Sequence, residues 1–132
     1  MGNKIKILIV DDSRFLRKIV SDFIGRTDDI DVIGAVSNGR EALDFIYNQK
    51  PDLITLDVEM PVMDGLTFLE KLKQSGEKIP VIMLSVLTQQ GAQATFRALD
   101  LGAYDFVPKP SPELDISVKE VQDQLIDRKS VV

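Results

Sequence analysis

The chain has 132 residues, a length typical of one domain, and its 44% hydrophobic residues are enough for a packed core. It contains no histidine and no cysteine, which excludes disulfides, thiolate chemistry, a Ser-His-Asp triad within the chain and a soft-metal site. The formal net charge of -5 argues against direct nucleic-acid binding, because nucleic-acid-binding domains usually present a basic face. The apolar runs are far shorter than a membrane span and no signal peptide precedes them, so we expect a cytoplasmic domain without membrane contact.

Segments with strand-like and helix-like patterns alternate strictly along the chain. Short runs of aliphatic and β-branched residues predict five strands, at residues 4–10, 31–37, 53–56, 81–85 and 104–107. Apolar residues at helical spacing predict a helix after each strand, at residues 13–26, 38–50, 64–75, 88–101 and 111–125.

Three of the predicted helices begin at clear capping signals. Asn38, with Glu41 three residues later, has the pattern of a capping box. Asp64 can cap the third helix. Ser111 before Pro112 predicts a cap followed by proline at the first helical position.

The strict alternation also predicts how the segments assemble. Phe15 belongs to the apolar stripe of the first helix, and Thr95 and Phe96 belong to that of the fourth. The strands are almost continuously apolar, as expected when helices cover both faces of a sheet. Five βα units in succession predict a parallel, doubly wound sheet with right-handed crossovers. In such sheets ligands bind beyond the carboxyl ends of the strands, so the residues after each strand are the candidates for chemistry.

Polar residues lie at the carboxyl ends of four predicted strands. They are Asp11, Asp12 and Ser13 after the first, Asp57 after the third, Ser85 at the end of the fourth, and Lys109 and Pro110 after the fifth. Each has an ordinary explanation by itself, such as helix capping or a solvated loop. Because the predicted fold brings these strand ends to one edge of the sheet, together they predict a single site.

The residue types at this edge indicate phosphoryl chemistry. Three crowded carboxylates repel one another and raise their own pKa values unless a cation intervenes, and Mg²⁺ prefers such oxygen ligands. Lys109 adds a compact positive charge and Ser85 a hydroxyl donor. The set fits transfer of a phosphoryl group onto Asp57, with the metal and the lysine neutralising the equatorial oxygens.

The whole chain resembles a bacterial response-regulator receiver domain. The resemblance is carried by IVDDS, LDVEMPVMDG, MLS and GAYDFVPKP, in this order and spacing. It implies a (βα)5 flavodoxin-like sandwich whose five-stranded parallel sheet has the order 2-1-3-4-5. It also implies that Asp57 accepts a phosphoryl group from a histidine kinase. Asp12 would bind Mg²⁺ (or Mn²⁺) directly and Asp11 mainly through water, and Asp57 itself and the backbone carbonyl of Glu59 would be further ligands.

The same resemblance assigns roles on the switch side of the site. Lys109 would pair with the phosphoryl group, and its bond to Pro110 would be cis. Ser85 would hydrogen-bond a phosphoryl oxygen and pull its loop inward. Phe106 occupies the aromatic switch position, although simple core packing explains it equally well. The predicted readout face is formed by the fourth helix, the fifth strand and the fifth helix.

A narrower resemblance is to the receiver of the chemotaxis protein-glutamate methylesterase. It rests on LDVEMPVMDGL, on the LT after Ser85 and Val86, and on ATFRALDLGAYDFVPKP. In that family a linker and a hydrolase domain follow, so residues 1–125 would be the receiver and 126–132 the start of the linker or a frayed tail. This chain alone would carry only phosphorylation and dephosphorylation of its own aspartate. Its partners would be a chemotaxis-type histidine kinase and the methylesterase domain of the intact protein, and we expect a monomer.

Two residues are candidates for tuning the lifetime of the phosphoryl group. The methylesterase pattern usually has a second small serine after the switch serine, and here the residue is Val86. A bulkier apolar side chain there would shield the site and slow entry or hydrolysis of the phosphoryl group. The side chain of Glu59 can face the attacking water, although a solvated loop acid explains it equally well.

Three alternatives remain open from the sequence. The chain is also compatible with a stand-alone receiver or the receiver of another response regulator. A haloacid-dehalogenase-type phosphatase has an acid two residues after its nucleophile, here Glu59 after Asp57, but its pattern needs aspartate there and leaves Asp11 and Asp12 unexplained. A flavodoxin-like FMN binder would need a Ser/Thr/Gly phosphate loop after the first strand, where two acids stand instead.

Overall fold

The computed structural model describes residues 4–86, 88–111 and 116–128. Its five strands are β1 (Ile5–Val10), β2 (Ile30–Val36), β3 (Leu53–Asp57), β4 (Val81–Ser85) and β5 (Asp105–Pro108). Its helices are α1 (Arg14–Ile24), α2 (Gly39–Asn48), α3 (Gly65–Gln74), α4 (Gln89–Asp100) and α5 (Val118–Arg128). The strands form one parallel sheet in the order β2-β1-β3-β4-β5, which confirms the predicted fold class and strand order.

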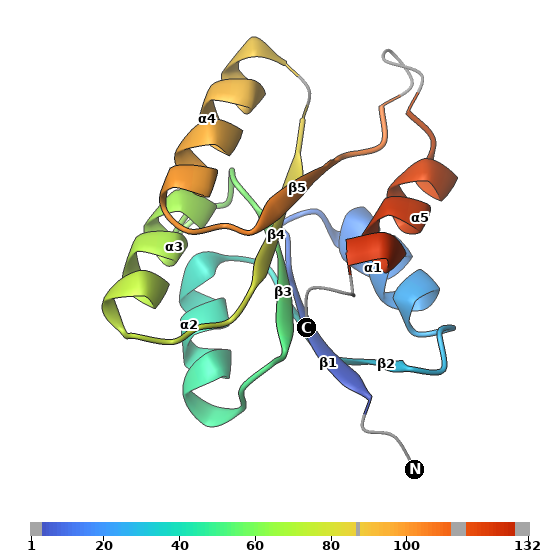
Figure 1. Cartoon of the computed structure of the whole chain (residues 1–132), viewed down its shortest axis with the longest axis horizontal. Coiled ribbons are helices and arrows are strands. Elements are labelled where there is room, and N and C mark those ends of the chain that lie inside the picture. Colours follow the sequence, from blue (N-terminus) through green and yellow to red (C-terminus); the bar gives the residue numbers. More distant parts are fainter. Residues whose placement is uncertain (1–3, 87, 112–115, 129–132) are drawn as a thin grey trace.

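Helices cover both faces of the sheet. Helices α1 and α5 lie on one face, and α2, α3 and α4 lie on the other (Figure 1). Alternate residues of β1 enter the two layers: Ile7 and Ile9 pack toward α1 and α5, while Leu8 and Val10 pack toward α2, α3 and α4. The apolar runs of the strands are therefore continuous because both of their faces are buried.

Side-chain caps begin the helices α2 and α3. The Asn38 side chain accepts a hydrogen bond from the Glu41 backbone N–H at 2.9 Å, as the capping-box pattern predicts. The Glu41 carboxylate, however, accepts from the N–H of Ser37 at 2.7 Å, one residue before the cap. Asp64 accepts from the N–H of Thr67 at 2.8 Å. These caps satisfy donors that the first turn of each helix leaves free.

The prediction that the fifth helix begins at Pro112 is wrong. Helix α5 begins at Val118. Ser111 pairs with Ile116 through two backbone hydrogen bonds of 2.9 Å, in an isolated antiparallel bridge. Because Ile116 belongs to this bridge, α5 does not extend back to it. Pro112 itself lies outside the described residues.

Helix α5 continues to Arg128, three residues into the segment 126–132 for which we expect a linker or frayed tail. Arg128 Nε donates to the Asp105 carboxylate at 3.1 Å and ties the end of α5 to the start of β5. Residues 129–132 lie outside the described residues, and the boundary at residue 125 stays a prediction.

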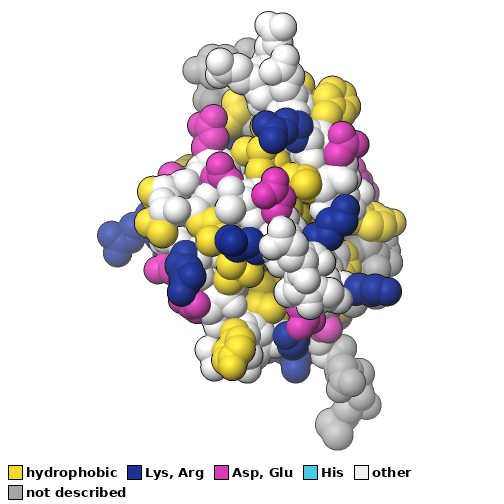
Figure 2. All heavy atoms as spheres, turned by 90° about the vertical axis from the view of Figure 1, so that its left-hand side faces the viewer, with side chains coloured by type: hydrophobic (Ala, Val, Ile, Leu, Met, Phe, Trp, Pro, Cys, Tyr) yellow, Lys and Arg dark blue, Asp and Glu magenta, His cyan; other side chains and the backbone are white. Residues whose placement is uncertain are grey.

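Two aromatic residues of the predicted stripes do not face the core. Phe15 is 68% exposed and Phe96 is 66% exposed. In α4 the buried positions are Thr95 and Ala98. Figure 2 looks onto the side of α2, α3 and α4, where apolar atoms are interspersed with acidic and basic side chains. In the described part of the chain, every helix is too short or too polar to cross a membrane.

Candidate functional site

Strand register brings the predicted residues together at the carboxyl edge of the sheet. Val10 pairs with Leu56, so Asp11 follows β1 next to the end of β3. Ser85 pairs with Pro108, and the Lys109 N–H donates to the Ser85 carbonyl at 2.8 Å. A cavity of about 380 Å³ opens at this edge, and Asp12, Asp57, Ser85 and Lys109 are among the residues that line it.

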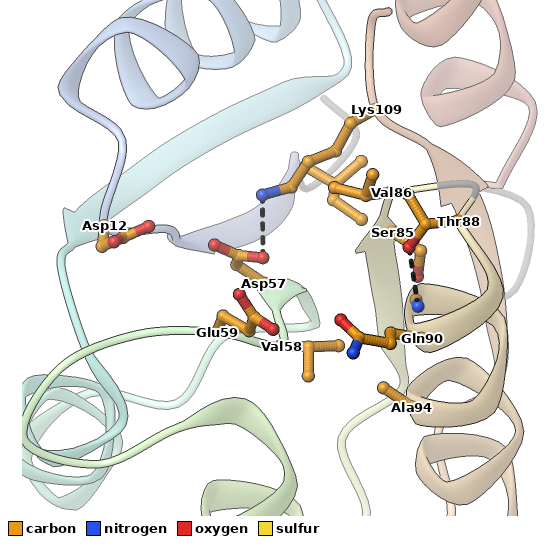
Figure 3. Close-up of a pocket in the computed structure, with 12 residues that line it drawn as sticks. Asp12, Asp57, Val58, Glu59, Ser85, Val86, Thr88, Gln90, Ala94 and Lys109 are labelled. Atoms are coloured by element: carbon orange, nitrogen blue, oxygen red, sulfur yellow. Dashed lines mark hydrogen bonds and ion pairs between the residues drawn. The ribbon is translucent and has the colours of Figure 1, made fainter. Parts of the chain in front are cut away.

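Asp57 and Lys109 form the central contact of the site. Lys109 Nζ lies 2.8 Å from Asp57 Oδ1 (Figure 3). The same nitrogen lies 3.9 Å from Asp11 Oδ2. Asp57 is only 5% exposed, although it borders the cavity. The positively charged ammonium group of Lys109 therefore lies against a nearly buried carboxylate that still borders the cavity.

Three carboxylates gather around this contact. Oxygens of Asp11, Asp12 and Asp57 lie within 4.8 Å of one another, with Asp12 exposed and the other two buried. Asp11 Oδ1 accepts the Ser13 N–H at 2.8 Å, but its buried Oδ2 has no hydrogen-bond partner among the described residues. A buried carboxylate oxygen without a partner is costly, so the donor set fits a hard cation such as Mg²⁺.

Burial perturbs both inner carboxyl groups in the same direction. Removal from water raises the pKa of Asp57 to about 6, and repulsion from Asp11 adds to the rise, while the hydrogen bond from Lys109 opposes it. Burial likewise raises the pKa of Asp11, against the attraction of Lys109. The cluster thus favours a proton or a cation in its midst.

The β3–α3 turn depends on a glycine. The Gly65 N–H donates to the Val58 carbonyl at 2.7 Å, which folds the chain back as soon as β3 ends. A Cβ at Gly65 would lie 2.2 Å from the carbonyl oxygen of Asp57. Only glycine lets α3 begin this close behind the candidate nucleophile.

Ser85 does not contact Asp57 directly in the described hydrogen-bond network. Its Oγ lies 2.7 Å from Oγ1 of Thr95 in α4, and both residues are buried. The same Thr95 Oγ1 lies 2.8 Å from the Gly91 carbonyl oxygen. The sequence placed Thr95 on an apolar stripe, and nothing in its type or spacing indicated this contact.

Two further residues at the site escaped the sequence reasoning. Arg17, in the second turn of α1, donates to the Asp11 backbone carbonyl at 2.7 Å and fixes the β1–α1 loop. Gln90 lines the cavity, and its side chain points into it from the first turn of α4 (Figure 3). For Arg17, the available sequence signal was an arginine four residues after the capping residue Ser13. For Gln90 there was no signal, because a glutamine in a polar first turn of a helix is ordinary.

The remaining predicted residues occupy distinct places. Glu59 and Val86 both line the cavity, and Val86 is 48% exposed. Phe106 is partly buried and packs against the core under α2, α3 and α4. The prediction of a cis peptide bond between Lys109 and Pro110 is wrong, because no peptide bond in the described residues is cis. Trans is the lower-energy form of an X–Pro bond unless its surroundings enforce cis.

The comparison with protein families favours a receiver domain over the phosphatase and the FMN binder that the sequence left open. The model of the response regulator receiver domain family matches residues 7–119. The chain belongs to this family. It is a receiver domain of a response regulator, and the strand order of its sheet agrees with that assignment.

The receiver domain is also similar to individual relatives. Over 126 residues it is 48% identical to a protein-glutamate methylesterase/protein-glutamine glutaminase of Pyrococcus horikoshii, covering 96% of this chain and 34% of that protein. The corresponding Bacillus subtilis protein is 46% identical over 124 residues, covering 94% of this chain and 34% of the relative. The chain therefore spans about a third of the length of these relatives.

Solved structures give the same picture. The response regulator domain of Thermotoga maritima CheB is 36% identical with a TM-score of 0.84, covering 96% of this chain and 93% of that one. A CheX-CheY-BeF3-Mg+2 complex from Borrelia burgdorferi contains a chain that is 30% identical with a TM-score of 0.74, covering 94% of this chain and 91% of that one.

Proposed function

We propose that this receiver domain is a phosphorylation switch whose acceptor is Asp57. The observation that carries the proposal is the ion pair of 2.8 Å between Asp57 and Lys109 at the mouth of a cavity. An Asp57 oxygen forms the new bond to phosphorus, and the phosphorus–nitrogen bond of a phosphohistidine donor breaks, leaving its electron pair on the imidazole. Lys109 stays close enough to neutralise charge that develops on the equatorial oxygens.

Asp11, Asp12 and the backbone carbonyl of Glu59 would hold Mg²⁺ (or Mn²⁺) beside the acceptor. The support is the cluster of three carboxylates and the unpartnered oxygen of Asp11. The ion, when bound, would neutralise carboxylate and phosphoryl charge together. Thermal unfolding in a Mg²⁺ titration should show stabilisation of the wild type, and Asp11→Asn should weaken it.

Phosphorylation would act by shifting a conformational equilibrium. It adds negative charge and acceptor oxygens at Asp57. Ser85 and Lys109 gain from these oxygens only in the conformation that brings both toward the phosphoryl group, so that conformation becomes more populated. The conformational change would be read out at the face formed by α4, β5 and α5, because Ser85 and Phe106 link the site to these elements.

Labelling with a small acyl phosphate and Mg²⁺ tests the acceptor. Wild type should incorporate one phosphoryl group, and Asp57→Asn should incorporate none. The matched control is Asp64→Asn, because Asp64 is the exposed N-cap of α3 and asparagine caps equally well. Persistent labelling of Asp57→Asn, or loss of labelling in Asp64→Asn, would refute the assignment.

We also propose that the intact protein is a chemotaxis methylesterase, controlled by a chemotaxis-type histidine kinase, in which residues 1–125 are the receiver and the linker starts at 126–132. The support is the name shared by the relatives and the third of their length that this chain spans. We propose a cytoplasmic location and a monomeric receiver. Reading the gene beyond Val132 distinguishes this protein from a stand-alone receiver or another response regulator, and sedimentation tests the monomer.

A further inference from the structure

The hydroxyl of Ser85 is engaged by α4 rather than by the acid cluster. Ser85 and Thr95 are 3% and 4% exposed, so water does not compete freely for their hydroxyl groups. Thr95 Oγ1 stands between two oxygens, at 2.7 Å from Ser85 Oγ and 2.8 Å from the Gly91 carbonyl. Both distances are those of good hydrogen bonds.

Counting hydrogens fixes the direction of these bonds. The Gly91 carbonyl can only accept, so the single hydrogen of the Thr95 hydroxyl must be directed to it for that bond to form. The second bond then requires Ser85 to donate its own hydrogen to Thr95 Oγ1. Phosphoryl oxygens are acceptors as well. Ser85 therefore cannot serve Thr95 and a phosphoryl group on Asp57 with the same hydrogen.

The start of α4 makes Thr95 a fixed partner. The Gly91 N–H donates to Thr88 Oγ1 at 2.9 Å, and the Thr88 N–H donates to the Val86 carbonyl at 2.9 Å. A Cβ at Gly91 would lie 1.9 Å from the Val86 carbonyl oxygen, which shows how closely the turn is folded against the helix. Because Thr95 is also held by Gly91, Ser85 is the side of the bond that is free to change partner.

We propose that Thr95 is a positioning residue that holds the Ser85 hydroxyl in the unphosphorylated state and competes with the phosphoryl group for its hydrogen. The inference rests on the proposed function. In the unphosphorylated state the bond to Thr95 gives the buried Ser85 hydroxyl a hydrogen-bond partner. In the phosphorylated state Ser85 turns to the new acceptor, and Thr95 keeps its bond to Gly91. The strength of this bond sets how strongly the free protein resists the active conformation.

Removing the Thr95 hydroxyl should therefore favour the phosphorylated conformation. In Thr95→Val the Ser85 hydroxyl loses its partner only in the free state, because the phosphoryl bond does not involve Thr95. One neutral hydrogen bond lost from one side of the equilibrium corresponds to a roughly fivefold change. A role in packing alone would act in the opposite direction, since a damaged α4 would bind the phosphoryl group less well.

The test is the affinity of the protein for beryllofluoride with Mg²⁺, a phosphoryl analogue, measured by fluorine NMR. Thr95→Val and Thr95→Ala should bind roughly fivefold more tightly than wild type, and Thr95→Ser should restore wild-type affinity. Thr55→Val is the matched control, because Thr55 is a buried threonine whose hydroxyl has no partner among the described residues. It should leave the affinity unchanged. Thermal unfolding checks that each variant is folded.

A second arm asks whether the effect depends on Ser85. In a Ser85→Ala background Thr95→Val should have no effect on affinity, because the bond it breaks is already absent. Unchanged or weaker binding by Thr95→Val and Thr95→Ala, or an effect that persists without Ser85, would overturn the inference. Absence of analogue binding by wild type, together with absence of labelling at Asp57, would refute the proposed function itself.

Discussion

Replacing Asp57 by asparagine should stabilise the metal-free protein at neutral pH, although it removes the candidate nucleophile. Burial raises the pKa of Asp57 from 3.8 to about 6 in the folded chain. A shift of this size corresponds to about 3 kcal/mol of free energy of unfolding, at 1.36 kcal/mol for each pKa unit. The side chain is partly screened and asparagine loses the ion pair with Lys109, so we expect a gain of about 1 to 2 kcal/mol.

The sign of the pH dependence follows from the direction of the shift. A carboxyl group whose pKa is raised by folding binds its proton more tightly in the folded state, so its ionisation destabilises the fold. The penalty is complete above a pH of about 6 and disappears as the pH falls to the ordinary value of 3.8. The advantage of Asp57→Asn should therefore be large at about pH 8 and small at about pH 4.

Urea unfolding with a chelator, at both pH values, measures this difference. Asp64→Asn should change the free energy of unfolding by only a few tenths of a kcal/mol, since both residues cap well. Adding Mg²⁺ should stabilise the wild type and narrow the gap to Asp57→Asn, because the ion neutralises the cluster. An Asp57→Asn protein that is less stable than wild type at about pH 8, or a gap that does not shrink in acid, would contradict the reasoning.

Three further substitutions test other parts of the structure. Gly65→Ala places a Cβ 2.2 Å from the Asp57 carbonyl oxygen and should cost about 2 to 3 kcal/mol in urea unfolding, whereas Gly76→Ala, which meets no atom within 4 Å but has a φ of +80°, should cost only about 1 kcal/mol. Val86→Ala opens the mouth of the cavity and should speed loss of the phosphoryl group from labelled protein; equal decay rates would exclude shielding by this side chain. Thr55→Val removes a buried hydroxyl without a partner in the described chain and should raise the free energy of unfolding by about 1 kcal/mol, so a lower melting temperature would count against it.

The fold was predictable because its patterns are redundant. Five apolar runs alternate with five helical patterns, and each helix can bury its stripe only against a sheet covered on both faces. The gathering of Asp11, Asp57, Ser85 and Lys109 followed directly, because parallel strands end at one edge. Motifs that end strands are therefore the part of a site that sequence reasoning recovers best.

The misses share a physical cause, which is that they depend on side-chain geometry or on one backbone choice. An apolar residue at helical spacing can lie at the margin of a stripe, and Phe15 and Phe96 are exposed for that reason. Thr95 was placed on the apolar stripe of the fourth helix, because a hydrogen bond of its hydroxyl group produces no periodic pattern in the sequence. Pro110 shows that the sequence alone does not determine the isomer of an X–Pro peptide bond, since the same residue pair can be cis or trans.

The two hydrophobic layers lie on either side of the sheet, and the Ser85–Thr95 contact is a buried polar contact between β4 and α4. The apolar contacts that hold the domain together thus involve other groups than the hydroxyl groups and cavity residues for which we propose a role in the switch. If the proposed switch holds, small polar or cavity-lining substitutions should change its response while its folding remains nearly unchanged.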